Sequence, residues 1–82
     1  MPVVTIAGAA GLRFTGGLAD IRVEATTIRR LITKLNAHFP GLGREVDDGM
    51  AIAINGVIHQ DAYGTALPED AEIVLLPKIG GG

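Results

Sequence analysis

The segment 28–39 constrains the fold most, because its apolar residues recur with the period of an α-helix. At about 100° per residue they all fall on one narrow stripe, formed by Ile28, Leu31, Ile32, Leu35 and Phe39. The Thr27 hydroxyl is suited to cap the start of this helix, and Pro40-Gly41 is suited to end it. A chain of 82 residues forms one core, so the fold must bury this single stripe against a second layer.

Five other segments have the patterns of β-strands, and they can supply that layer. They are residues 3–6, 20–24, 50–54, 57–59 and 72–76. Asn55-Gly56 predicts a type I′ hairpin, because both central residues of that turn need a positive φ. The glycines of residues 8–11 predict a loop. The order predicts an α+β fold of the β-grasp type. One main helix packs on one face of a mixed four- to five-stranded sheet, whose first and last strands are parallel and central.

Composition excludes several classes of function. The chain has no cysteine, which removes disulfides, thiolate metal sites and cysteine nucleophiles together. A net charge of −2 and only three aromatic residues argue against nucleic-acid binding. No run approaches the roughly 20 apolar residues of a membrane span, and no signal peptide is recognisable, so we expect a cytoplasmic protein. His38 and His59 lack further ligands at workable spacing, so we expect no metal site.

The last strand is apolar on both faces, although a single helix can cover only one of them. Ile73 and Leu75 share one face, and Glu72 suggests that its own face is the one turned to solvent. The predicted outward set is then Val3, Thr5, Ala51, Ala53, Val74 and Leu76. A contiguous apolar patch of this kind is typical of a partner surface. The alternative is that the segment 61–68 covers it.

The chain closes on three glycines, Gly80, Gly81 and Gly82, after a strand that Pro77 ends. We therefore divide it into a β-grasp domain, 1–78, and a flexible tail, 79–82. A glycine arm can thread a narrow channel and present the Gly82 carboxylate at its tip; plain fraying is the alternative. A carboxylate must be activated before it can donate an acyl group, most simply by adenylation with ATP. Residues 8–11 match no phosphate-binding motif, so the activating enzyme must be a separate protein.

The C-terminal block LPEDAEIVLLPKIGGG, residues 67–82, resembles the end of the MoaD/ThiS sulfur-carrier family, whose members are ubiquitin-like β-grasp proteins. LRFTGG, residues 12–17, and AINGV, residues 53–57, also resemble segments of MoaD-like carriers. The resemblance implies that the Gly82 carboxylate is adenylated and then converted to a thiocarboxylate. A ubiquitin-activating-type adenylyltransferase, similar to MoeB or ThiF, would use the ATP. The chain itself would bind no cofactor and catalyse no reaction.

The resemblance to MoaD implies the small subunit of molybdopterin synthase, which inserts its tail into the large catalytic subunit and delivers sulfide there to a biosynthetic intermediate. The alternatives are a carrier for cysteine or methionine, thiamine or a specialised thio-metabolite, a ubiquitin-like protein modifier, and a β-grasp binding module with an inert tail. Gly80 and Gly81 would thread the partner's channel. The predicted partner-binding residues are Ala51, Ala53, Val74, Leu76, Pro77, Lys78 and Ile79.

Overall fold

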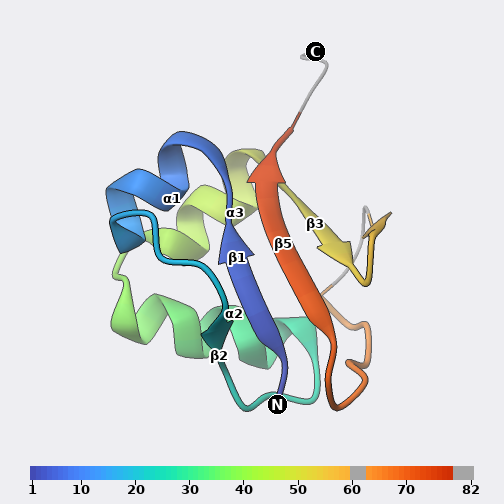
Figure 1. The fold of residues 1–82 in the computed structure, drawn as a ribbon. Coiled ribbons are helices and arrows are strands. Elements are labelled where there is room, and N and C mark those ends of the chain that lie inside the picture. Colours follow the sequence, from blue (N-terminus) through green and yellow to red (C-terminus); the bar gives the residue numbers. More distant parts are fainter. Residues whose placement is uncertain (60–62, 79–82) are drawn as a thin grey trace.

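The computed structural model describes residues 1–59 and 63–78, and its central element is the last strand of the chain (Figure 1). The sheet order is β2-β1-β5-β3-β4. Along the chain the elements are β1 (Val3–Ile6), α1 (Gly8–Thr15), β2 (Ile21–Arg22), α2 (Ile28–His38), α3 (Leu42–Gly49), β3 (Met50–Ile54), β4 (Val57–His59) and β5 (Glu72–Pro77).

Strands β1 and β5 run parallel, with Val4 beside Ile73 and Ile6 beside Leu75. The pairs β1–β2, β3–β4 and β3–β5 are antiparallel. The predicted α+β class, the mixed sheet and the parallel pairing of the first and last strands are therefore confirmed.

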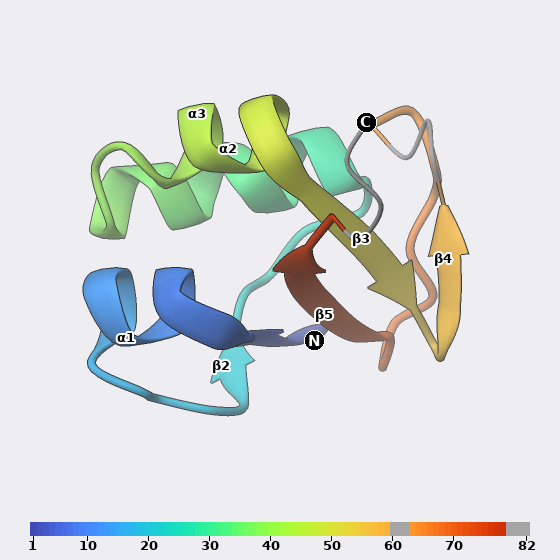
Figure 2. The same cartoon turned by 90° about the horizontal axis from the view of Figure 1, so that it is seen from above.

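Helix α2 buries the stripe that the sequence predicts. Thr27 caps it, because its hydroxyl oxygen accepts a hydrogen bond of 3.3 Å from the Arg30 N–H. Helices α2 and α3 lie together on one side of the sheet (Figure 2). The core between these layers includes Val4, Ile6, Ile28, Leu31, Ile32, Leu35, Leu42, Val46, Ile52, Ile54, Ile73 and Leu75.

The loop predicted at residues 8–11 is wrong, because these residues begin α1. The reason lies in tertiary packing rather than in helix propensity. A Cβ atom on Gly11 would lie 2.0 Å from the Ile6 carbonyl oxygen, so only glycine lets the helix pack this close to β1. Ala10 and Gly11 form its buried side, and Leu12 is 71% exposed. The helix therefore lacks the large apolar stripe by which helices are recognised.

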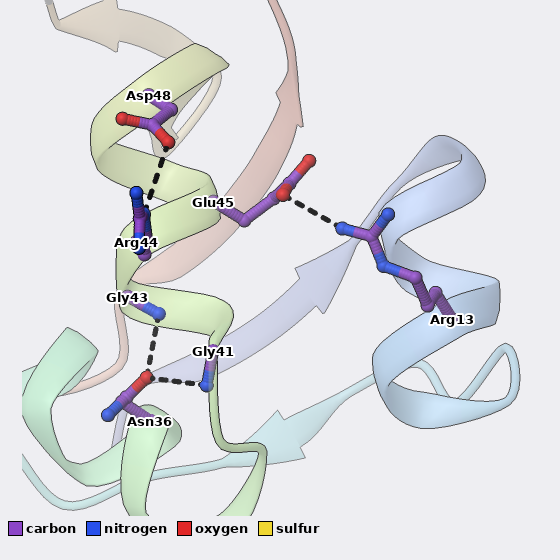
Figure 3. Close-up of polar contacts among 7 residues, drawn as sticks. All are labelled: Arg13, Asn36, Gly41, Gly43, Arg44, Glu45 and Asp48. Atoms are coloured by element: carbon purple, nitrogen blue, oxygen red, sulfur yellow. Dashed lines mark hydrogen bonds and ion pairs between the residues drawn. The ribbon is translucent and has the colours of Figure 1, made fainter.

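Helix α3 was not anticipated either, and a side chain of α2 organises the turn that leads into it. The Asn36 side-chain oxygen accepts hydrogen bonds from the N–H groups of Gly41, at 3.2 Å, and Gly43, at 2.9 Å (Figure 3). Leu42 and Val46, four residues apart, are buried on its inner side. This two-residue stripe anchors α3 beside α2.

Two predictions about the strands have different outcomes. The strand expected at residues 20–24 shortens to β2, which has two residues. The hairpin between β3 and β4 is confirmed as type I′, since Asn55 has φ 49° and Gly56 has φ 82°.

Candidate functional site

The end of β5 is held by hydrogen bonds on both sides. The Ala7 N–H donates to the Leu75 carbonyl at 2.8 Å, and the Lys78 N–H donates to the Gly49 carbonyl at 3.1 Å. Lys78 therefore lies where α3 passes into β3, and the preceding residue, Pro77, lies against Gly8 at the start of α1. The chain is fixed up to the last described residue, so whatever follows leaves from a defined point on the surface.

Gly8 lies against Pro77 where the chain leaves the sheet, a place that we call the exit of β5. The sequence analysis did not identify this residue. Its φ is +73°, and a Cβ atom there would lie 3.0 Å from Pro77 Cγ. Both the backbone conformation and the close approach of Pro77 therefore require glycine. The only signal in the sequence is a glycine that follows a strand, which by itself predicts a turn.

An ion pair links α1 to α3. Arg13 Nη2 lies 2.8 Å from Glu45 Oε2, and Figure 3 shows the two side chains meeting between the helices. The Arg13 guanidinium also lies 4.8 Å from the centre of the Phe14 ring. Both charged side chains are about half exposed, so the pair contributes at most about 1 kcal/mol.

The solvent-facing side of β5 lies on the strand that leads to this exit. Ile73 and Leu75 are 0% exposed, whereas Val74 and Leu76 are half-buried, as the alternation predicts. Thr5 and Ala53 flank Val74, and Ala51 lies beside Leu76. The side of the sheet opposite α2 and α3 carries no helix over β5 or β3 in the described part of the chain (Figure 2). The predicted outward residues thus form a contiguous surface, which we call the open face: Val3, Thr5, Ala51, Ala53, Val74 and Leu76.

Ala53 differs from the other predicted contact residues, because it is only 8% exposed. It lies between Val74 of β5 and Ile58 of β4 in the sheet register. Its methyl group is therefore covered by the larger side chains on either side. We correct its predicted role from a direct contact to the floor of the open face.

Sequence reasoning missed Ile58, which is 58% exposed and extends the open face onto β4. The hairpin at Asn55-Gly56 offered a signal, since a two-residue turn pairs Ala53 with Ile58. Residues 63–68 do not cover this face. Tyr63 and Leu67 instead hydrogen-bond to the chain around the start of α2, through Arg29 and Thr26.

The remaining predictions concern the tail residues, metal binding and membrane spans. Ile79 and Gly80, Gly81 and Gly82 lie outside the described residues. Among residues 1–59 and 63–78, no three His, Cys, Asp or Glu residues are grouped so as to hold a metal ion. In the same ranges, none of the helices has the length and apolar character needed to cross a membrane.

Comparison with known proteins gives a family and a fold. The model of the ThiS family matches residues 12–82. The crystal structure of Mycobacterium tuberculosis CysO, an antigen, superimposes with a TM-score of 0.81 at 18% identity, covering 96% of this chain and 100% of that one. That likeness supports the β-grasp fold. No curated protein matches. The family match spans most of the chain and extends through the terminal glycines, and the chain therefore belongs to the ThiS family of sulfur-carrier proteins.

Proposed function

We propose that the chain carries sulfur as a thiocarboxylate on Gly82, after a separate adenylyltransferase of the MoeB/ThiF type has activated that carboxylate. The observation that carries the proposal is the continuity of the ThiS family match from the folded domain to Gly82. The fixed exit of β5 and the open face beside it provide the surface that such a partner needs.

Covalent geometry limits where the partner can bind. Residues 79–82 follow Lys78, and four residues span at most about 14 Å when fully extended. The partner's nucleotide site must therefore open close to the end of β5, and the partner must contact the surface around it. Leu76 and Val74 lie on the strand that leads to this exit. We therefore assign the open face to the partner interface.

The proposed chemistry has two steps. A carboxylate oxygen of Gly82 attacks the α-phosphorus of ATP, and pyrophosphate leaves. The sulfur of a sulfide or persulfide donor then attacks the acyl carbon, and AMP leaves with one of the original carboxylate oxygens; a persulfide donor also needs a thiol to cleave the resulting acyl disulfide. The carrier contributes an arm that ends in three glycines and brings its carboxylate to the nucleotide, because near-attack geometry is sensitive to displacements of about 1 Å.

For the accepting enzyme we propose the large subunit of molybdopterin synthase, in which a biosynthetic intermediate takes the sulfur, on the resemblance of the C-terminal block to MoaD. Lys78 argues for an alternative acceptor, since many molybdopterin-synthase small subunits resembling this chain have proline or a small apolar residue there. LRFTGG, residues 12–17, resembles carriers of cysteine biosynthesis. Incubating the thiocarboxylate form with each acceptor enzyme separately would distinguish these products.

Exchange of labelled pyrophosphate into ATP tests the activation step, because acyl-adenylate formation is reversible. We expect exchange with the native chain and the adenylyltransferase. Leu76→Asp should lower it at least about tenfold, since an interface carboxylate would be desolvated without a partner. The matched control Thr33→Asp introduces the same charge at an exposed position of α2 and should retain exchange. Equal exchange rates for Leu76→Asp and Thr33→Asp would show that the open face is not part of the interface.

A further inference from the structure

The contact between Gly8 and Pro77 joins the start of α1 to the last residue of β5. A Cβ atom on Gly8 would lie 3.0 Å from Pro77 Cγ and 3.5 Å from Pro77 Cδ. Carbon atoms in ordinary contact are about 3.5–4.0 Å apart, so a side chain at position 8 would separate the two elements by about 0.5–1 Å. How firmly each element is held decides which of them moves.

The α1 side of this contact is fixed to the sheet. The Ala7 N–H, directly before Gly8, donates to the Leu75 carbonyl at 2.8 Å. Gly11 is buried in α1, and a Cβ atom there would lie 2.0 Å from the Ile6 carbonyl oxygen. The start of α1 is therefore held by both β1 and β5, the two central parallel strands, and it yields little to a side chain at position 8.

The Pro77 side of the contact is held less firmly. Pro77 is exposed, and as a proline it has no N–H with which to bond to the sheet. Lys78, which follows it, donates its N–H to the Gly49 carbonyl at 3.1 Å. Because the proline ring locks φ at about −65°, a displaced ring turns Lys78 instead of being absorbed at Pro77. The contact with Gly8 therefore determines the position and direction in which the chain leaves β5.

We propose that Gly8 is a positioning residue for the reaction at Gly82, and that it acts through Pro77. The proposal rests on the sulfur-carrier function proposed above. A partner that binds the open face holds Leu76, so the exit of β5 must lie in register with the channel that receives the tail. A displacement of about 0.5–1 Å at the exit is comparable with the roughly 1 Å to which near-attack geometry is sensitive. Gly8 keeps the exit in register because it has no side chain.

Pyrophosphate exchange with the adenylyltransferase, measured over a range of carrier concentrations, tests this role. Gly8→Ala should lower the maximum rate at least about tenfold but change the half-saturating concentration less than about threefold, because the open face is unaltered. Gly16→Ala is the matched control: its φ is +69°, against +73° at Gly8, and no atom lies within 4 Å, so it adds similar backbone strain without a contact. Equal maximum rates for the two variants would refute the role of Gly8, whereas no exchange with the native chain would refute the proposed function itself.

Residual dipolar couplings of the isotopically labelled free chain test the geometry without any activity, because they report the orientation of the Lys78 N–H bond. We expect this coupling to change in Gly8→Ala and to stay native in Gly16→Ala. Pro77→Ala removes the ring at an exposed position, so it should also change the coupling and keeps the test decisive if Gly8→Ala does not fold. Adding Gly8→Ala to Pro77→Ala should change nothing further, since the ring atoms that the new Cβ would meet are absent. A native Lys78 coupling in folded Gly8→Ala, or in Pro77→Ala, would overturn the proposal.

Discussion

Placing one carboxylate on each face of β5 should give two very different proteins. Ile73 and Val74 are neighbours in sequence, but Ile73 is 0% exposed under α2 and Val74 is half-buried on the open face. The variants Ile73→Asp and Val74→Asp add the same group to the same strand. Any difference in their stability therefore measures which face of the sheet is the core.

The structure sets the expected magnitudes. A domain of 82 residues has a free energy of unfolding of about 4–12 kcal/mol. Ile73→Asp loses about 1.5–3 kcal/mol of apolar burial and adds several kcal/mol for an unpaired buried charge, which together approach or exceed that total. Val74→Asp should cost about 1 kcal/mol in strand propensity, and the melting temperature should fall by about 4–8 °C.

Thermal and urea unfolding followed by circular dichroism is the assay. We expect a cooperative transition for Val74→Asp and none for Ile73→Asp at neutral pH. Ile73→Ala, with an expected cost of about 2–5 kcal/mol, gives a measurable value if the charged variant is unfolded. A cooperative Ile73→Asp with an unfolded Val74→Asp would show that the faces are inverted.

Three further predictions concern α1, Tyr63 and the tail. Gly11→Ala should destabilise, because its Cβ would lie 2.0 Å from a β1 carbonyl oxygen, whereas Gly49→Ala, with no atom within 4 Å, should be neutral or stabilising by up to about 1 kcal/mol; urea unfolding compares them. Burial, followed by the charge of Asp47, raises the pKa of Tyr63 above its ordinary value. The contribution of the neutral Tyr63 phenol to the stability of the fold should therefore be complete below about pH 10 and be lost as the pH rises through the folded pKa. Asp47→Asn should lower that pKa in an ultraviolet titration. Deleting residues 81–82 should leave the melting temperature almost unchanged, since the β5 ladder ends at position 77.

Much of the fold could be predicted because its signals are local and strong. The stripe of α2, the Thr27 cap and the Asn55-Gly56 turn each depend on a few neighbouring residues, and each is confirmed. The two faces of β5 could be distinguished because one acidic residue, Glu72, marks the solvent side. Because one helix can cover only one face of the sheet, the same residues also indicate which face of each strand is buried.

Helices α1 and α3 could not be predicted, because tertiary packing forms them. Gly11 is unfavourable for a helix in isolation, but here its missing Cβ lets α1 approach β1. The buried residues of α3 are only Leu42 and Val46, and its first turn is held by the Asn36 side chain of another helix. The burial of Ala53 likewise depends on its neighbours across the sheet rather than on its own strand.

The intact mass of the chain after incubation with ATP, the adenylyltransferase and a sulfide source tests the central claim most directly. We predict an increase equal to one sulfur replacing one oxygen, located in the fragment that ends at Gly82. A chain with one residue added after Gly82 should show no such increase, because its carboxylate lies beyond the point where the partner positions the reacting atoms. Formation of the thiocarboxylate at the same rate on the extended chain, or no mass change on the native one, would contradict the assignment of Gly82 as the sulfur-carrying residue.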